Sequence, residues 1–215
     1  MRVFFDSYYE FHTRVQLMDH LLDVEDLFPG NLNEWDVVAV YRCAFPNGLL
    51  SQGAGKVIAY DSVAFIVQVA QGLTLDKLGQ DLKRLEDLSR LTLSEMRLRN
   101  IVYSSPYVTG KPLRILVYGH SGISRRNLES ELRRAPSGFD CLVVVKEDIL
   151  AVSPNNPFSG VFGGKTLTIM EGEALFHLLT NLFMGVQRYS SIDLFRTLWN
   201  VRNAAIGQEM LSKTE

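Results

Sequence analysis

The chain has 215 residues, of which 47% are hydrophobic and 21% charged, and its formal net charge at pH 7 is −2. These proportions are typical of a globular protein and exclude a disordered or fibrous class, and the near-neutral charge excludes a global basic field for binding nucleic acid. A chain of this length buries a substantial core, so we expect a single domain over residues 1–215.

Cysteine usage and the N-terminus bear on the cellular compartment. Cys43 and Cys141 both lie in apolar, strand-like runs without metal-ligand spacing, so neither structural zinc nor a disulfide framework is expected. Charges at Arg2 and Asp6 interrupt the N-terminus, and no run of about 18 uncharged apolar residues occurs. We therefore expect a cytoplasmic protein that does not contact a membrane.

The first part of the chain predicts a helix followed by two strands. Apolar residues recur at roughly helical spacing over residues 4–28, which predicts an amphipathic helix. Residues 36–43 predict the first strand. The turn residues 46–48 predict a hairpin from that strand to a second one over residues 56–59, with a loop at 51–55.

A third strand is predicted over residues 63–70, where the polar Gln68 interrupts an apolar, β-branched run. A polar side chain in a buried strand costs free energy unless it has a partner or a function. Thr74 then caps a predicted helix over residues 75–91. The face opposite its apolar stripe carries Lys77, Gln80, Lys83 and Arg84.

Strands and helices alternate in the second half of the chain, which favours an α/β fold with helices packed on a mixed sheet. Strands are predicted over residues 114–118, 141–146, 149–152 and 165–170. Helices are predicted over residues 124–134, 173–186 and 192–200, with a weaker one from Ser94. Loops are predicted over residues 106–112 and 153–164.

The order of these elements resembles the core of the PD-(D/E)xK nuclease superfamily. There an Asp opens the second core element, and an E-x-K or D-x-K tripeptide lies on the next long strand. Asp36 occupies the first position here, and residues 68–70, Gln-Val-Ala, fall where the tripeptide belongs. The resemblance covers about residues 4–118 and implies a restriction-endonuclease-like mixed central sheet flanked by helices. The C-terminal αβ extension, about 119–215, is similar to that of uncharacterised bacterial proteins of the superfamily.

The motif needs two carboxylates and a lysine. The carboxylates hold Mg²⁺ or Mn²⁺, which polarises the scissile phosphate and lowers the pKa of a bound water, while the lysine orients that water. The resemblance therefore implies Asp36, Gln68 and Ala70 as catalytic positions, with Asp36 and Gln68 as metal positions. Gln68 is a neutral and poorer ligand, and Ala70 supplies no ammonium, so we expect little or no hydrolysis.

Two losses confined to the catalytic positions indicate either an engineered, inactive form of an active nuclease or a naturally decayed one. The substitutions Gln68→Glu and Ala70→Lys would recreate a typical motif. The resemblance implies DNA as the partner and a role in bacterial defence. Two rival hypotheses remain: a pseudo-nuclease that binds DNA or a protein without cutting, and an unrelated α/β protein in which Gln68 is a satisfied polar group of the core.

Further candidate residues have plainer alternatives. Glu10 is a candidate metal ligand on the first predicted helix, or a solvated carboxylate. Gln80 and Lys83 are candidates for phosphate contact, or part of a charged helix face. Arg125 and Arg126 are candidates for DNA-backbone contact, or members of surface ion pairs. The apolar C-terminal helices are consistent with a homodimer interface and equally with core packing.

Overall fold

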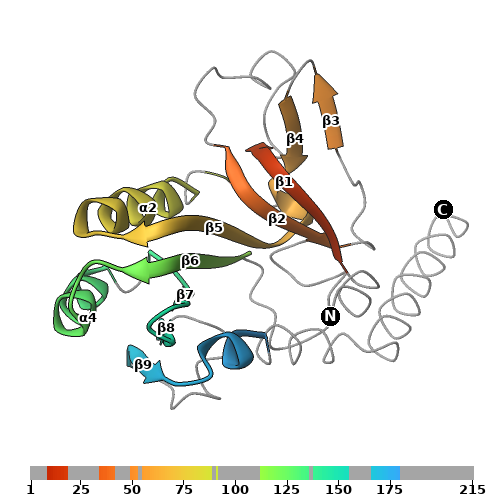
Figure 1. The fold of residues 1–215 in the computed structure, drawn as a ribbon. Coiled ribbons are helices and arrows are strands. Elements are labelled where there is room, and N and C mark those ends of the chain that lie inside the picture. The colour runs from red at the N-terminus through yellow and green to blue at the C-terminus, as the bar shows by residue number, and fades with distance from the viewer. Residues whose placement is uncertain are drawn as a thin grey trace, which may run out of the picture.

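The computed structural model describes residues 9–18, 34–41, 49–52, 55–88, 91, 112–135, 138–154 and 166–179. Its strands form one mixed sheet in the order β3-β4-β1-β2-β5-β6-β7-β8-β9 (Figure 1). The strands are β1 (Tyr9–Met18), β2 (Trp35–Tyr41), β3 (Leu49–Gln52), β4 (Gly55–Ala59), β5 (Val63–Leu73), β6 (Leu113–Ser121), β7 (Cys141–Val144), β8 (Ile149–Val152) and β9 (Thr168–Glu171). The predicted mixed α/β sheet is confirmed.

The middle of the sheet combines antiparallel and parallel pairing. Strand β2 pairs antiparallel with β1 and β5, whereas β5, β6 and β7 run parallel to one another. Strand β5 therefore lies between an antiparallel and a parallel neighbour, and its first residues, Val63 to Ile66, are all buried. A near-continuous apolar run of this kind is what a strand covered on both faces requires.

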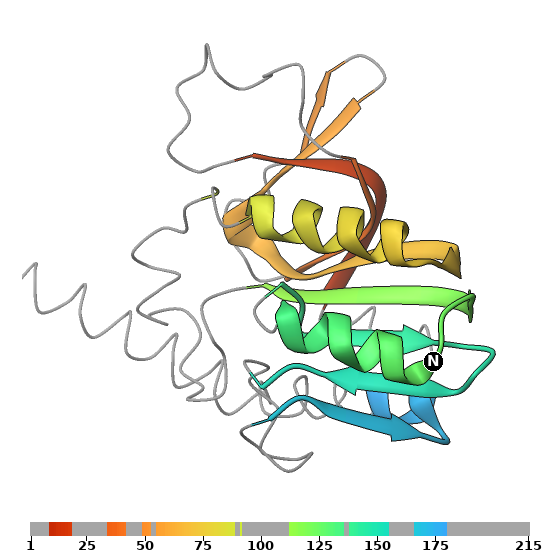
Figure 2. The same ribbon diagram turned by 90° about the vertical axis from the view of Figure 1, so that its left-hand side faces the viewer.

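Two helices cover one face of the sheet, where they lie side by side (Figure 2). Helix α2 (Leu75–Asp87) begins after Thr74, whose hydroxyl accepts the Lys77 amide N–H at 3.2 Å. Helix α4 (Arg125–Arg134) begins after Ser124, whose hydroxyl accepts the Asn127 amide N–H at 3.3 Å. Both predicted caps are confirmed. The helices bury five leucines against the sheet, namely Leu78, Leu82, Leu85, Leu128 and Leu132.

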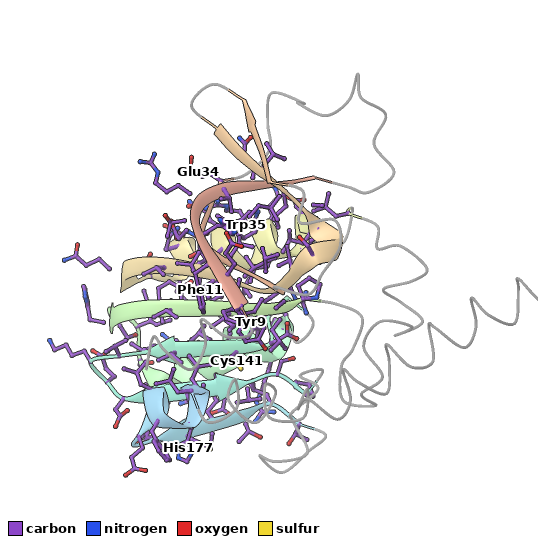
Figure 3. All side chains as sticks on the ribbon, turned by 90° about the vertical axis from the view of Figure 1, so that its right-hand side faces the viewer. Tyr9, Phe11, Glu34, Trp35, Cys141 and His177 are labelled. Atoms are coloured by element: carbon purple, nitrogen blue, oxygen red, sulfur yellow. The ribbon has the colours of Figure 1, made fainter. Side chains whose placement is uncertain are left out.

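The opposite face carries a second apolar cluster (Figure 3). The rings of Tyr9 and Phe65 meet edge to face with their centroids 5.2 Å apart, and Phe11 lies 5.8 Å from Phe65. Residues 174–179 are helical, and Ala174 from this turn is buried in the same cluster. The sheet is thus flanked by helical residues on both faces.

The predicted helix over residues 4–28 is wrong where the structure describes it, because residues 9–18 form β1. Apolar residues at Tyr9, Phe11, Val15 and Leu17 alternate with polar ones, so this segment satisfies a period of two as well as a helical spacing. Pairing with β2 on one side and β4 on the other decides between the two periods. Tertiary pairing overrides the local pattern here.

The predicted hairpin is also misplaced. Strand β4 is present, but it pairs antiparallel with β3 and parallel with β1, and it does not neighbour β2. Residues 51–52, assigned to a loop, belong to β3. The predicted hairpin between β2 and β4 is therefore wrong, because β4 pairs with β1 and β3.

Several sequence predictions lie outside the described residues. These are the weak helix from Ser94, most of the loops at 106–112 and 153–164, the helices beyond residue 179 and the homodimer interface on those helices. In the part of the chain that the structure describes, no helix combines the length and the apolar character that crossing a bilayer requires.

Candidate functional site

Asp36 and Gln68 meet where β2 and β5 begin to diverge. The antiparallel ladder pairs Val38 with Ile66 and Val37 with Val67, so the next residues in register are Asp36 and Gln68. Here the Asp36 carboxylate, and not a backbone carbonyl of β2, accepts the backbone N–H of Val69 in β5. Its Oδ2 atom accepts the Gln68 Nε2–H at 2.5 Å and the Val69 amide N–H at 2.8 Å. The structure thus brings together the two predicted metal positions.

Gln68 is only 6% exposed, and its two amide atoms have different environments. Nε2 donates to Asp36, whereas Oε1 is buried and has no hydrogen-bond partner among the described residues. A buried polar atom without a partner costs free energy, so this position is not optimised for packing alone. The Gln68 side-chain N–H and the Val69 amide N–H are thus both donors to the Asp36 carboxylate.

The resemblance implies a divalent cation, so the donor set has to be compared with what Mg²⁺ or Mn²⁺ requires. These ions take oxygen ligands, and carboxylates dominate their sites. The inner oxygen of Asp36 already accepts two N–H groups, and Gln68 turns an NH₂ group toward it instead of a second carboxylate. The residues present therefore do not fit a divalent cation.

Position 70 lies on the same side of β5 as Gln68, because side chains alternate along a strand. Ala70 is partly buried against the core beneath α2, and its partner in the parallel ladder is Tyr118 of β6. The Tyr118 hydroxyl donates to Asp81 Oδ2 at 2.8 Å, and Lys77 Nζ donates to Asp81 Oδ1 at 2.8 Å. A second polar cluster, Lys77–Asp81–Tyr118, therefore lies beside the vacant lysine position.

The environment of Tyr118 follows from its burial. Burial raises the pKa of the Tyr118 phenol well above its usual value, and the negative charge of Asp81 together with the hydrogen bond to it raises the pKa further. Tyr118 therefore remains a neutral hydrogen-bond donor to Asp81 throughout the physiological range. This contact ties α2 to Tyr118 of β6, the ladder partner of Ala70.

Arg84 connects α2 to the start of β2. Its guanidinium carbon lies 5.2 Å from the centroid of the Trp35 ring, and its Nη2 donates to the Glu34 carbonyl at 2.5 Å. Arg84 Nε is buried without a partner among the described residues. The expectation that Lys77 and Arg84 lie on the helix face away from the sheet is therefore wrong, because both side chains turn inward to polar partners.

The structure does not bring Glu10 to this pair. Glu10 is exposed on β1, opposite Val40, and its Oε1 lies 3.4 Å from His12 Nε2. Four residues separate it along β1 from the position opposite Asp36, which is about 13 Å at the rise of a strand.

The remaining nucleic-acid candidates lie on the outer surfaces of the helices. Gln80 and Lys83 are exposed on α2, and Arg125 and Arg126 are exposed at the start of α4. Arg125 forms an ion pair with Glu171 of β9 at 2.5 Å. The basic group on α4 also contains intrahelical ion pairs, Arg133–Glu129 and Arg134–Glu131, as the surface alternative expects.

Sequence reasoning missed Asp81 as a member of the site. Asp81 lies three residues after Leu78 and four before Leu85, inside the apolar stripe of α2. An acid in a buried stripe, with a lysine four residues earlier, indicates a buried ion pair. Tyr118 carried no such signal, because tyrosines are common in strands and are often buried there for packing alone.

No family model matches the sequence, and neither does any curated protein. Among solved structures, NucC of P. aeruginosa ATCC27853 in its cAAA-bound form has a TM-score of 0.61 and 14% identity, with 85% of this chain and 74% of that chain covered. The apo form of NucC from E. coli MS115-1 has a TM-score of 0.55 and 17% identity, with 82% and 76% covered. Its cAAA-bound form has a TM-score of 0.54 and 16% identity, with 83% and 71% covered. At these identities the likeness establishes the restriction-endonuclease-like fold of this chain.

Proposed function

We propose that this chain has the scaffold of a metal-dependent DNA nuclease of bacterial defence, with an active site that is disabled at positions 68 and 70. The observation that carries the proposal is the Gln68–Asp36 hydrogen bond at the point where β2 and β5 diverge. The fold that the chain shares with NucC supports the proposal, as does the resemblance to the PD-(D/E)xK superfamily at Asp36 and residues 68–70. DNA as the substrate and Mg²⁺ or Mn²⁺ as the metal belong to this proposal.

The chemistry explains why a single atom at position 68 matters. A glutamate there would place a second carboxylate beside Asp36, and two adjacent carboxylates attract a divalent cation. The glutamine offers an N–H group instead, which satisfies Asp36 without any ion. The unchanged chain is therefore expected to fold and to remain inactive, while keeping the surfaces of the scaffold.

The test compares the unchanged chain with the double variant Gln68→Glu, Ala70→Lys on plasmid and single-stranded DNA. Each protein is assayed with Mg²⁺ or Mn²⁺, and with and without cAAA, the ligand of two of the similar structures. We expect cleavage at least about 100-fold faster for the double variant, because a bound metal stabilises the transition state by several kcal/mol. Mn²⁺ should also raise the Tm of the double variant alone.

The matched control adds Asp36→Asn to the double variant, which removes the remaining carboxylate and should abolish both cleavage and the Mn²⁺ effect on Tm. If the double variant folds but neither cuts DNA nor responds to metal, the nuclease scaffold proposal is wrong.

A second candidate function is a binding module that binds DNA without cleaving it. It is favoured by the Asp36–Gln68 pair, which is complete without a cation. It predicts that the unchanged chain retards DNA in a gel in the presence of EDTA, whereas a strictly catalytic scaffold needs metal for tight binding.

A further inference from the structure

We propose that Arg84 is a positioning residue for Asp36, because it anchors the start of β2 to α2 and so keeps the Asp36 carboxylate on β5 without any cation. The Asp36–β5 contact consists of the hydrogen bonds from Gln68 Nε2 and from the Val69 backbone N to Asp36 Oδ2. The inference goes beyond the proposed function, since it requires neither a bound metal nor hydrolysis.

The first argument is that Asp36 lies at a gap in both strand ladders. The ladder between β2 and β5 ends at Val37. The ladder between β1 and β2 has no pair for Asp36 between its pairs at Val37 and Trp35. Arg14, the residue of β1 at this gap, has a φ of 55°, which a non-glycine residue seldom adopts. Residues 34–36 therefore depend on side-chain contacts more than on regular pairing.

The second argument comes from comparing the two arginines that contact Glu34. Arg14 forms an ion pair with the Glu34 carboxylate at 2.8 Å, but the Arg14 side chain is 81% exposed, and an exposed pair contributes little. Arg84 donates from Nη2 to the Glu34 carbonyl at 2.5 Å. Its guanidinium carbon also lies 5.2 Å from the centroid of the buried Trp35 ring, a cation–π contact that gains strength where water is excluded. Arg84 is therefore the main anchor of the residues directly before Asp36.

The third argument is that Arg84 projects from a helix that is itself fixed on the sheet. Helix α2 lies along β5 (Figure 2), and it buries three leucines in the core, namely Leu78, Leu82 and Leu85. Asp81 of the same helix has a side chain that is 0% exposed and accepts the Tyr118 hydroxyl of β6 at 2.8 Å. Because β5 and β6 are neighbours, α2 gives Arg84 a fixed position relative to β5.

The consequence is a coupling between α2 and the Asp36–β5 contact. Without Arg84, the start of β2 would separate from β5 more often, and Asp36 would move with it. The Val69 amide N–H would then be open to solvent, because Asp36 Oδ2 accepts it in the closed arrangement. Hydrogen exchange measures local opening of this kind.

The test measures hydrogen exchange of the Val69 amide by NMR in the full-length chain, once in EDTA and once in Mg²⁺. Arg84→Met keeps the apolar stem but removes the guanidinium. It should accelerate this exchange at least about tenfold, the effect of losing a hydrogen bond from a charged donor. Arg84→Lys keeps a charged donor and should accelerate the exchange less. The unchanged chain should protect Val69 equally in EDTA and in Mg²⁺, because the Asp36–β5 contact contains no cation.

A double variant separates positioning of Asp36 from general stabilisation of the fold. Asp36→Ala removes the acceptor, so it should accelerate Val69 exchange by itself. In that background Arg84→Met should add less than about twofold, because an anchor that acts through Asp36 then has no carboxylate to hold. A merely structural Arg84 would add the same acceleration in both backgrounds.

Two controls accompany these variants. Lys83→Met removes a neighbouring charge from the exposed surface of α2 and should leave Val69 exchange unchanged. The Ser153 amide, which donates to the Asp140 carbonyl at 3.0 Å, lies in a buried residue far from Arg84 in the sheet order. Its exchange rate corrects the Val69 rate for any change in global stability.

The inference is wrong if Arg84→Met leaves the corrected Val69 exchange unchanged, or accelerates it equally with and without Asp36. It is also wrong if Mg²⁺ slows Val69 exchange in the unchanged chain, since a cation would then take part in the contact. None of these results depends on DNA cleavage, so the nuclease proposal stands or fails separately, on the double variant at positions 68 and 70.

Discussion

At the scale of single residues, two buried or partly buried polar pairs lie at the candidate site. Gln68 satisfies Asp36 through its amide N–H, and Tyr118 satisfies Asp81 through its hydroxyl. In both pairs a neutral donor stabilises a carboxylate inside the fold. Removing the Tyr118 hydroxyl leaves Asp81 Oδ2 without this donor, which costs more than the hydrogen bond itself contributed.

Tyr118→Phe is predicted to lower the free energy of unfolding in a pH-dependent way. At pH 8 the loss is about 1.5–3 kcal/mol, because the hydrogen bond to the Asp81 carboxylate disappears. Burial and Asp81 raise the pKa of Tyr118 in the folded state, so the unfolded chain releases this proton first, at its ordinary pKa of about 10. The stability contributed by the neutral phenol is complete below that pH and declines as pH rises above it.

The unchanged chain and the Tyr118→Phe variant should therefore differ in free energy of unfolding by about 1.4 kcal/mol less at pH 11 than at pH 8. Urea unfolding at both pH values measures it. A difference that does not change with pH would show that Tyr118 ionises equally in the folded and unfolded chain.

At the scale of elements, the site depends on how closely β5, β6 and α2 approach one another. Gly119 follows Tyr118 in β6, and a Cβ atom at Gly119 would lie 2.7 Å from the Gln71 carbonyl oxygen of β5. Only glycine permits this approach, which keeps Tyr118 beneath Asp81. Gly79 in α2 has the opposite environment, because a Cβ atom there would meet nothing within 4 Å.

These two glycines form a matched pair for a stability measurement. Gly119→Ala should destabilise the protein by about 1–3 kcal/mol, because the strands must separate to admit the methyl group. Gly79→Ala should stabilise it by about 0.5–1 kcal/mol, since alanine costs less backbone entropy in a helix. For a chain of this size each kcal/mol of stability moves Tm by about 2–4 °C. Thermal denaturation therefore detects both the loss of stability in Gly119→Ala and the gain in Gly79→Ala. Equal shifts in the two variants would contradict this account of the β5–β6 contact.

At the scale of the whole molecule, the sheet is continuous from β3 to β9 across the described residues. The apolar cluster beneath α2 and α4 draws residues from strands on both sides of β5, from Ile58 of β4 to Ala151 of β8. The junction expected between a nuclease-like core and a C-terminal extension, after residue 118, falls within β6, which pairs with both β5 and β7. Such continuity favours a single cooperative unit.

Unfolding in urea is accordingly predicted to be one transition. In a Trp199→Phe variant the fluorescence reports Trp35 of β2 alone, because the chain has two tryptophans. Its midpoint should coincide with that of far-UV circular dichroism. Leu142→Ala, a fully buried change in β7, should move both midpoints together by about 2–5 kcal/mol of stability. Separate midpoints, or a shift in only one, would indicate that the extension unfolds independently.

Local chemistry alone predicted a large part of this fold. The sequence by itself determined strands β5 to β8, the caps at Thr74 and Ser124 and the alternation of strands and helices, because burial patterns and capping depend on neighbours in the chain. It also identified Gln68, since a polar residue in an apolar run is visible without a structure.

Only the tertiary structure decided which elements meet. The apolar pattern of residues 9–18 is compatible with both a helix and a strand, and pairing with β2 and β4 selects the strand. The contact between Asp36 and Gln68 arises from long-range register, as does the cluster of Lys77, Asp81 and Tyr118. The local i, i+4 spacing of Lys77 and Asp81 indicates their ion pair, but the partners Tyr118 and Gln68 come from distant segments, so no local pattern could have placed them.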